Sequence, residues 1–317
     1  MQPPIPEIPE GNSPRYAKEV LELYTKSAYQ GLTQSDWGNL LQSQHCEYLG
    51  RKCLKMRKSA PDITLGTCTV GYKGNAIVIC PYRFLQGMQI FRDVIPLLEG
   101  HEASNQIHVV SEVEIPGGNV DFFVVSSKDG TIQDYLALEI QALDTTGSWW
   151  PARQAFIKKH VDPTQTVEAK SFGMNWRMTA KTILVQMHHK AQTLDTLGKK
   201  LVLVVQDCLY TYMSAEFNTS RVRAAERADS VHFQVYSVNR RDHGRFGMTL
   251  RSHYSTTPAG IEVMLGASRS NEISESDMRA RLKLKMNAHT LLGGGFHPQD
   301  VVPQIETRIE TSEPAEV

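Results

Sequence analysis

Residues 107–143, IHVVSEVEIPGGNVDFFVVSSKDGTIQDYLALEIQAL, decide the fold of this chain. Three stretches rich in β-branched and apolar residues, 107–115, 120–126 and 135–143, are separated by the turn-forming segments PGGN and SKDG. This pattern predicts an antiparallel hairpin that leads into a third strand.

The segments that follow extend this sheet. An amphipathic pattern predicts a helix over residues 176–197, with Gly198 as its stop. The apolar run LVLVV at 201–205 predicts a buried strand. A hairpin, a third strand, a crossover helix and another strand together predict an α/β (α+β) fold, with a mixed central sheet flanked by helices.

The same patterns predict further elements outside this core. They are a helix over 15–28, a strand at 76–80, a helix over 86–98 that Pro96 bends or ends, a strand at 232–238 and a basic helix over 274–289.

The composition excludes some classes of protein. Lys and Arg together number 34, as do Asp and Glu, so the chain is not a strongly basic protein that coats nucleic acid. A local basic face remains compatible with DNA binding. No apolar run reaches the ~18 residues of a membrane span, and the proline-rich N-terminus lacks a secretory pattern. We therefore expect a cytoplasmic protein without a membrane partner.

Acidic residues interrupt the apolar strands of the core. Glu139 and Gln141 lie two apart in the third strand and share one face, and Asp121 begins the second strand. If these strands are neighbours, Asp121 and Glu139 can converge on one hard cation such as Mg²⁺, which prefers oxygen ligands. A solvated strand face is the alternative, but a charge inside an apolar run is costly unless it is paired or metal-bound.

The first strand offers one more carboxylate. A turn at Pro116-Gly117 pairs Glu112 with Asp121, whereas a turn at Gly117-Gly118 pairs Glu114 with it. The sequence leaves both registers open.

Four cysteines are clustered upstream, at Cys46, Cys53, Cys68 and Cys80. In a reducing compartment such a group more often binds metal than forms disulfides, and four thiolates would fill a tetrahedral structural site. Four buried thiols that pack as small hydrophobic groups are the alternative. The fifth cysteine, Cys208, stands apart.

Several segments resemble a known family. VDFF…LALEIQALDTTGSW resembles the active-site strands of the PD-(D/E)xK nuclease superfamily in its E-x-Q variant, and the match is closest to the NotI type of restriction endonuclease. GTC…VICPYR and NWRMTAKTILVQMHHKA are similar to segments of that family in the same order. The resemblance covers roughly residues 46–206 and implies a restriction-endonuclease-like fold with a small four-cysteine metal-binding subdomain.

The resemblance also implies a function. The expected protein is a prokaryotic type II restriction enzyme, a homodimer that hydrolyses double-stranded DNA at a palindromic, by analogy GC-rich, site with Mg²⁺ and leaves 5′-phosphates. Asp121 and Glu139 would bind the metal ion. Gln141 replaces the more usual Lys, and it can only position water or metal through hydrogen bonds. The additional acidic residue of the family maps best to Glu112, with Glu114 still possible.

The resemblance further implies iron or zinc at the four cysteines, and sulfur ligands do not discriminate between these metals. For DNA recognition we expect arginines of the later segment to contact bases or phosphates, although solvated charge is the alternative for each. The candidates are Arg240, Arg241, Arg245 and Arg251.

These expectations divide the chain into five parts. They are a flexible arm (1–14), an N-terminal region with the cysteine site (15–85), a nuclease core (86–210), an α/β DNA-recognition segment (211–299) and an acidic disordered tail (300–317). Two other functions compete with restriction: a PD-(D/E)xK nuclease for repair or junction processing, and a non-enzymatic DNA-binding protein scaffolded by its metal cluster.

Overall fold

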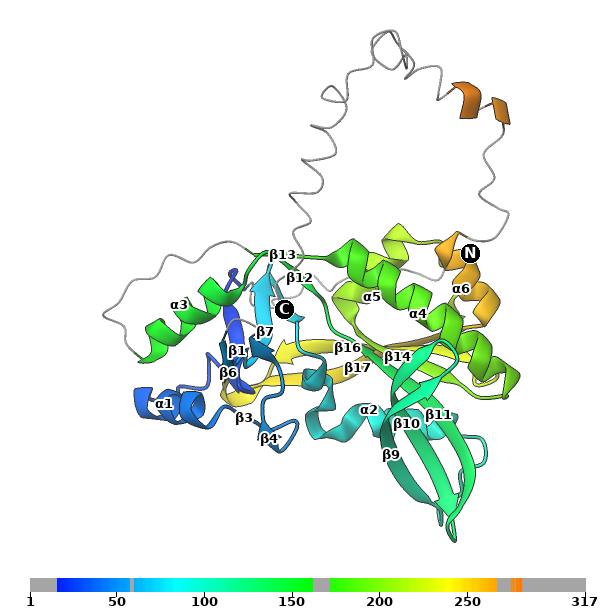
Figure 1. Cartoon of the computed structure of the whole chain (residues 1–317), viewed down its shortest axis with the longest axis horizontal. Helices are drawn as coiled ribbons and strands as arrows, with labels where there is room; N and C mark the ends of the chain where they lie inside the picture. Colours follow the sequence, from blue (N-terminus) through cyan, green and yellow to red (C-terminus); the bar gives the residue numbers. More distant parts are fainter. Residues whose placement is uncertain (1–15, 58–59, 162–171, 267–274, 277, 281–317) are drawn as a thin grey trace.

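The computed structural model describes residues 16–57, 60–161, 172–266, 275–276 and 278–280. Within them, seven strands form one sheet: β9 (Gln106–Ile115), β10 (Gly118–Lys128), β11 (Thr131–Gln141), β14 (Leu201–Gln206), β15 (Arg223–Ala224), β16 (Val231–Arg240) and β17 (Phe246–Thr256). Their order is β15-β17-β16-β14-β11-β10-β9. Strand β14 runs parallel to both neighbours, β11 and β16, and the other pairs are antiparallel. The predicted mixed central sheet is confirmed (Figure 1).

The turn between β9 and β10 is tight. Gly118 pairs with Ile115, so Pro116 and Gly117 form the turn. Gly117 and Gly118 have φ angles of +105° and +115°, which side chains rarely allow. A Cβ atom on Gly117 would also lie 3.0 Å from the carbonyl carbon of His189 in helix α4 (Trp176–Thr196). The two glycines therefore let the chain reverse directly against this helix.

Helices cover both faces of the central sheet (Figure 1). One face packs against α4, α5 (Asp207–Glu216) and α6 (Pro258–Leu265). The opposite face packs against η1 (Pro81–Met88), α2 (Gln89–Val94) and η2 (Ile95–Leu97). Every residue of β14 is buried, which explains why LVLVV lacks the alternation of a half-exposed strand. The predicted helices at 86–98 and 176–197 are confirmed, the first as the series η1, α2 and η2.

A second, four-stranded sheet lies beside the first, in the order β2-β1-β7-β8. Its strands are β1 (Val20–Leu23), β2 (Lys26–Ser27), β7 (Thr67–Tyr72) and β8 (Asn75–Val78). Helices α1 (Gln34–Ser43) and α3 (Trp150–Val161) pack beside it. The Trp37 and Phe156 rings are in edge-to-face contact, with their centroids 5.2 Å apart. The expected strand at 76–80 is found as β8.

The helix predicted over residues 15–28 is wrong, because this segment forms β1 and β2. Val20 and Leu23 pack into one core cluster and Leu21 into another, so both faces of β1 are covered. A strand buried on both faces loses its period-two pattern, and a short apolar run then fits a helix equally well. Tyr24 and Thr25 adopt positive φ and turn the chain back into β2.

Short paired strands complete the described fold. They are β3 (His45–Cys46) with β4 (Arg51–Lys52), β5 (Met56–Arg57) with β6 (Ala60–Thr64), and β12 (Thr145–Thr146) with β13 (Gly173–Met174); η3 (Asp242–Gly244) lies in the β16–β17 turn.

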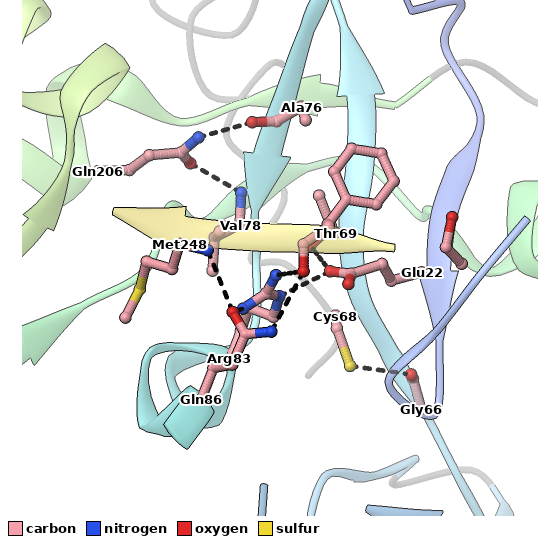
Figure 2. Close-up of polar contacts among 12 residues, drawn as sticks. Glu22, Gly66, Cys68, Thr69, Ala76, Val78, Arg83, Gln86, Gln206 and Met248 are labelled. Atoms are coloured by element: carbon pink, nitrogen blue, oxygen red, sulfur yellow. Dashed lines mark hydrogen bonds and ion pairs between the residues drawn. The ribbon is translucent and has the colours of Figure 1, made fainter. Parts of the chain in front are cut away.

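The side chain of Gln206 joins the two sheets. Gln206 ends β14, and its amide oxygen accepts the backbone N–H of Val78 at 2.8 Å while its NH₂ donates to Ala76 O at 2.6 Å (Figure 2). The amide thus satisfies one donor and one acceptor on β8 as a neighbouring strand would. Leu143 N adds a backbone bond to Val78 O at 3.1 Å.

A buried ion pair provides a second junction. Arg83 in η1 donates through Nε to Glu22 Oε2 in β1 at 2.7 Å and through Nη2 to Phe246 O in β17 at 3.0 Å (Figure 2). The Thr69 hydroxyl also donates to this carboxylate. One guanidinium thereby connects the small sheet with an outer strand of the central sheet.

Some expected segments lie outside the described residues: the arm 1–14, the tail 300–317 and most of the basic helix 274–289. Strands β15, β16 and β17 come from the segment 211–299 and complete the central sheet. Among the helices that the structure describes, none has the length and apolarity needed to cross a membrane.

Candidate active site

Asp121 and Glu139 face each other on neighbouring strands. Phe122 pairs with Leu138 in the antiparallel β10–β11 ladder, and the same register sets Asp121 opposite Glu139. Asp121 Oδ2 accepts the backbone N–H of Ile140 at 2.8 Å, which fixes its carboxylate against β11. The two carboxylates lie within electrostatic reach of each other, and their shared role at a metal ion stays a prediction.

The register of the first hairpin distinguishes Glu112 from Glu114. The pairs Val113–Val120 and Ser111–Phe122 flank Asp121 and set Glu112 opposite it, whereas Glu114 pairs with Asn119. Glu112 has a φ of 57°, a left-handed conformation in mid-strand that a non-glycine residue adopts only under local strain. Its charge also contributes to the raised pKa of Asp121.

Burial changes the ionisation of both carboxyl groups. Glu139 is only 4% exposed, and burial raises its pKa to about 7, with the Asp121 charge adding to the rise and a hydrogen bond from Lys190 opposing it. Burial also raises the pKa of Asp121, against the lowering effects of the Ile140 N–H and the Lys190 charge. A nearby positive charge stabilises the ionised form of two carboxyl groups that repel each other.

Sequence reasoning missed Lys190, which is 4% exposed. Its Nζ donates to Glu139 Oε1 at 2.7 Å and also to the backbone oxygen of Asn119. The missed signal was its position in α4: Lys190 lies among Met187, Ala191 and Leu194, at helical spacing on the buried face. A lysine in an apolar stripe implies a buried anionic partner.

Gln141 follows Glu139 on the same face of β11 and is half-buried. Its amide NH₂ donates to the neighbouring Ala142 O at 2.5 Å. The Gln141 amide is thus bonded within its own strand segment, whereas the ammonium that contacts Glu139 comes from Lys190.

The four clustered cysteines are all buried. The Cys68 thiol donates to Gly66 O at 3.5 Å, and its interaction with Cys80 raises the pKa of Cys68 well above its ordinary value and lowers that of Cys80 to about 7. Burial raises the pKa of Cys46, with smaller contributions from Cys80 and Cys53. Four thiols from separate segments thus lie within electrostatic reach of one another, while Cys208 is in α5.

The arginines proposed for DNA contact fall into two places. Arg240, Arg241 and Arg245 are exposed around the β16–β17 turn, where the Arg240 guanidinium lies 4.8 Å from the centre of the Tyr29 ring. Arg251 lies within β17 and forms an ion pair with Asp207 at 3.3 Å. Only the first three form one surface.

The carboxylate pair and the four cysteines differ in how well they fit a metal ion. Among the described residues, no group of three or more His, Cys, Asp and Glu side chains is placed to hold one. Mg²⁺ requires only one or two carboxylates together with waters and substrate oxygens, so the Asp121–Glu139 pair fits such an ion. A four-thiolate site requires all four ligands together, and it stays a prediction.

A mixed sheet flanked by helices, with an Asp and a Glu facing each other on neighbouring strands, is typical of PD-(D/E)xK nucleases. Residues 53–248, which are 196 of the 317 residues, match the family model described as restriction endonuclease NotI. The chain therefore belongs to the NotI restriction endonuclease family, and it is a type II site-specific deoxyribonuclease that binds double-stranded DNA. Comparisons with curated proteins and with solved structures gave no match.

The match contains Asp121, Glu139 and the facing Lys190 of α4. It begins at Cys53 and ends at Met248, so Cys46 and Arg251 lie outside it.

Proposed function

We propose that the Asp121–Glu139 pair is the catalytic centre, and that it hydrolyses phosphodiester bonds of double-stranded DNA with Mg²⁺, leaving 5′-phosphates. The observation that carries this proposal is a carboxylate pair, Glu139 buried and Asp121 half-buried, on two long strands of a family-defined endonuclease. A carboxylate buried beside a second one is costly unless a cation balances the charge, and a bound metal ion would do so.

Asp121 and Glu139 would hold the metal ion through carboxylate oxygens. Bound there, Mg²⁺ supplies a water of lowered pKa and offsets negative charge on the phosphate. The Ile140 N–H keeps the Asp121 carboxylate in place, so the ligands are oriented before substrate arrives. Glu112, opposite Asp121, is the third candidate, and Gln141 would position water by hydrogen bonds. Glu114 is the weaker candidate because it pairs with Asn119 instead.

The four cysteines would hold iron or zinc as a structural site. Their common burial, the Cys68–Cys80 interaction and the electrostatic contacts of Cys46 support this assignment. Tetrahedral thiolates leave no open position, so this metal would stabilise the fold and take no part in hydrolysis.

Sequence recognition would use the exposed Arg240, Arg241 and Arg245, with Arg251 less accessible because Asp207 already binds it. Arginine reads guanine in the major groove, which agrees with a GC-rich site. A palindromic site requires two copies of the chain related by a two-fold axis, so the active form would be a homodimer.

The test is cleavage of phage DNA by the purified protein with Mg²⁺, followed by mapping of the ends. We expect fragments that share one sequence at their ends and carry 5′-phosphates. Asp121→Asn and Glu139→Gln should each lower the cleavage rate by on the order of 10³-fold or more, because each removes a charge that binds the ion. DNA binding in Ca²⁺ should persist.

Asp129→Asn, in the exposed β10–β11 turn, is the matched control and should cut at the rate of the original protein. Full activity in either active-site variant would refute the assignment. Preference for branched DNA would indicate a repair nuclease, and binding without any cleavage would indicate a non-enzymatic DNA-binding protein.

A further inference from the structure

We propose that Lys190, on helix α4, is the positioning residue that supplies the positive charge which Gln141 cannot supply from the active-site strand. This inference rests on the catalytic role of Asp121 and Glu139 proposed above. It concerns the same site, and it assigns the missing cation to a different secondary-structure element.

The contacts of Lys190 are directed at the catalytic strands. Its ammonium donates to Glu139 Oε1 at 2.7 Å and to Asn119 O, two residues before Asp121. One ammonium therefore connects the two strands that carry the carboxylates, and it limits the rotamers of Glu139.

The backbone around Lys190 is held rigidly to the hairpin. Thr193, one turn later in α4, donates through its hydroxyl to Pro116 O at 2.8 Å. Gly117 approaches the backbone of His189 so closely that a Cβ there would lie 3.0–3.1 Å from atoms of His189 and Lys190. Two contacts from the β9–β10 turn thus fix the position of α4 relative to the hairpin, and with it the position of the Lys190 ammonium.

The energetics argue against a purely structural lysine. A buried ion pair is commonly no more stabilising than an apolar pair of the same volume, because both charges lose their hydration. Elsewhere along its buried face α4 carries apolar residues such as Ile183, Leu184 and Met187. A methyl-bearing side chain in place of Lys190 would continue that face. The charge at this one position thus matches the carboxylates of the site.

The role that follows is electrostatic and geometric. Glu112, Asp121 and Glu139 bring three carboxylates to one end of the strands, and Lys190 offsets part of their repulsion while it orients Glu139. Gln141, two residues from Glu139, is neutral and bonds to Ala142 O. The site therefore needs an ammonium beside Glu139, but that ammonium does not have to come from the strand position that Gln141 occupies. In this chain helix α4 carries it.

The experiment moves the lysine between the two positions. Lys190→Gln is expected to lower the cleavage rate at saturating Mg²⁺ on the order of 100-fold. The double variant Lys190→Met with Gln141→Lys is expected to cleave at least about tenfold faster than Lys190→Gln, since it returns an ammonium to the strand face that carries Glu139. Lys181→Gln, which removes an exposed lysine of the same helix, is the matched control and should be unchanged.

Calcium binding gives a readout that is independent of cleavage. Measured by calorimetry at pH 9, the affinity of Lys190→Gln for Ca²⁺ should rise about three- to tenfold, because a cation has been removed from beside the carboxylates. Slower cleavage together with tighter ion binding is the pattern of a positioning charge. Weaker ion binding with slower cleavage, and no rescue by Gln141→Lys, would show a structural lysine and overturn the proposal.

Two outcomes are kept apart by the design. If the unchanged protein cuts no DNA, the proposed function fails. If it cuts and Lys190→Gln cuts equally well, only the inference on Lys190 fails. If Lys190→Gln does not fold, Lys190→Arg and the double variant test the proposal instead, because each retains a cation near Glu139. A double variant that folds but does not cut DNA would overturn the proposal.

Discussion

The two sheets of this endonuclease bury different kinds of side chain. The central strand β14 contributes five consecutive apolar residues to the interior, and the buried residues of its neighbours β11 and β16 are mostly apolar. The small sheet buries the Glu22 carboxylate, threonines of β7 and the Cys68 thiol, and the Arg83 guanidinium of η1 is paired with Glu22. The central sheet therefore depends on area removed from water, while the small sheet depends on specific polar contacts.

This difference indicates where single substitutions act. In the central sheet, removing one methyl group weakens many small apolar contacts, each by a small amount. In the small sheet, one polar change leaves a buried partner unsatisfied, and that penalty is local and large. We therefore expect the small sheet to unfold first under chelation or polar mutation.

The largest expected effect comes from the cysteines. Elemental analysis should find about one iron or zinc per chain, and Cys68→Ser together with Cys80→Ser should abolish it. Loss of a structural metal removes several kcal/mol or more of folding free energy, so the melting temperature should fall by more than about 10 °C. Cys208→Ala is the control, with unchanged metal content. A metal-free protein of undiminished stability would leave four packed thiols as the explanation.

The next effect concerns the buried ion pair. Glu22→Gln leaves the Arg83 guanidinium without its anion in a dry environment, because Glu22 and Arg83 are 1% and 0% exposed. We expect a loss of about 3–5 kcal/mol in the free energy of unfolding, measured by urea denaturation. Glu102→Gln breaks the exposed pair with Lys128 and should change it by less than about 1 kcal/mol. Equal effects in the two variants would contradict the comparison.

The smallest effect should come from the link between the sheets. Gln206→Met keeps the side-chain length but leaves Val78 N–H and Ala76 O without their partner. The expected loss is about 1–3 kcal/mol, and hydrogen exchange should accelerate at Val78 more than in β14. Gln186→Met, on the exposed face of α4, serves as the control. Unaltered exchange at Val78 would mean that the Gln206 amide does not protect this N–H.

Much of the central sheet could be predicted because its patterns are local. Turn residues, apolar runs and helix stops located β9, β10, β11, α4 and β14 close to their bounds. The small sheet was harder to predict, because β1 is covered on both faces and its sequence shows no alternation of apolar and polar residues. Its identity depends on pairing with β7, more than 40 residues away in the chain.

By itself, the sequence determined the residues of the candidate site: Asp121, Glu139 and Gln141 at fixed spacing on predicted strands, and a carboxylate from the first hairpin. The tertiary structure alone decided which turn pairs Glu112 with Asp121, and that Lys190 donates to Glu139 from a helix 51 residues away in the chain. The physical reason is range. Alternation and turn chemistry are set by neighbouring residues, whereas register and the approach of α4 depend on how the whole core packs.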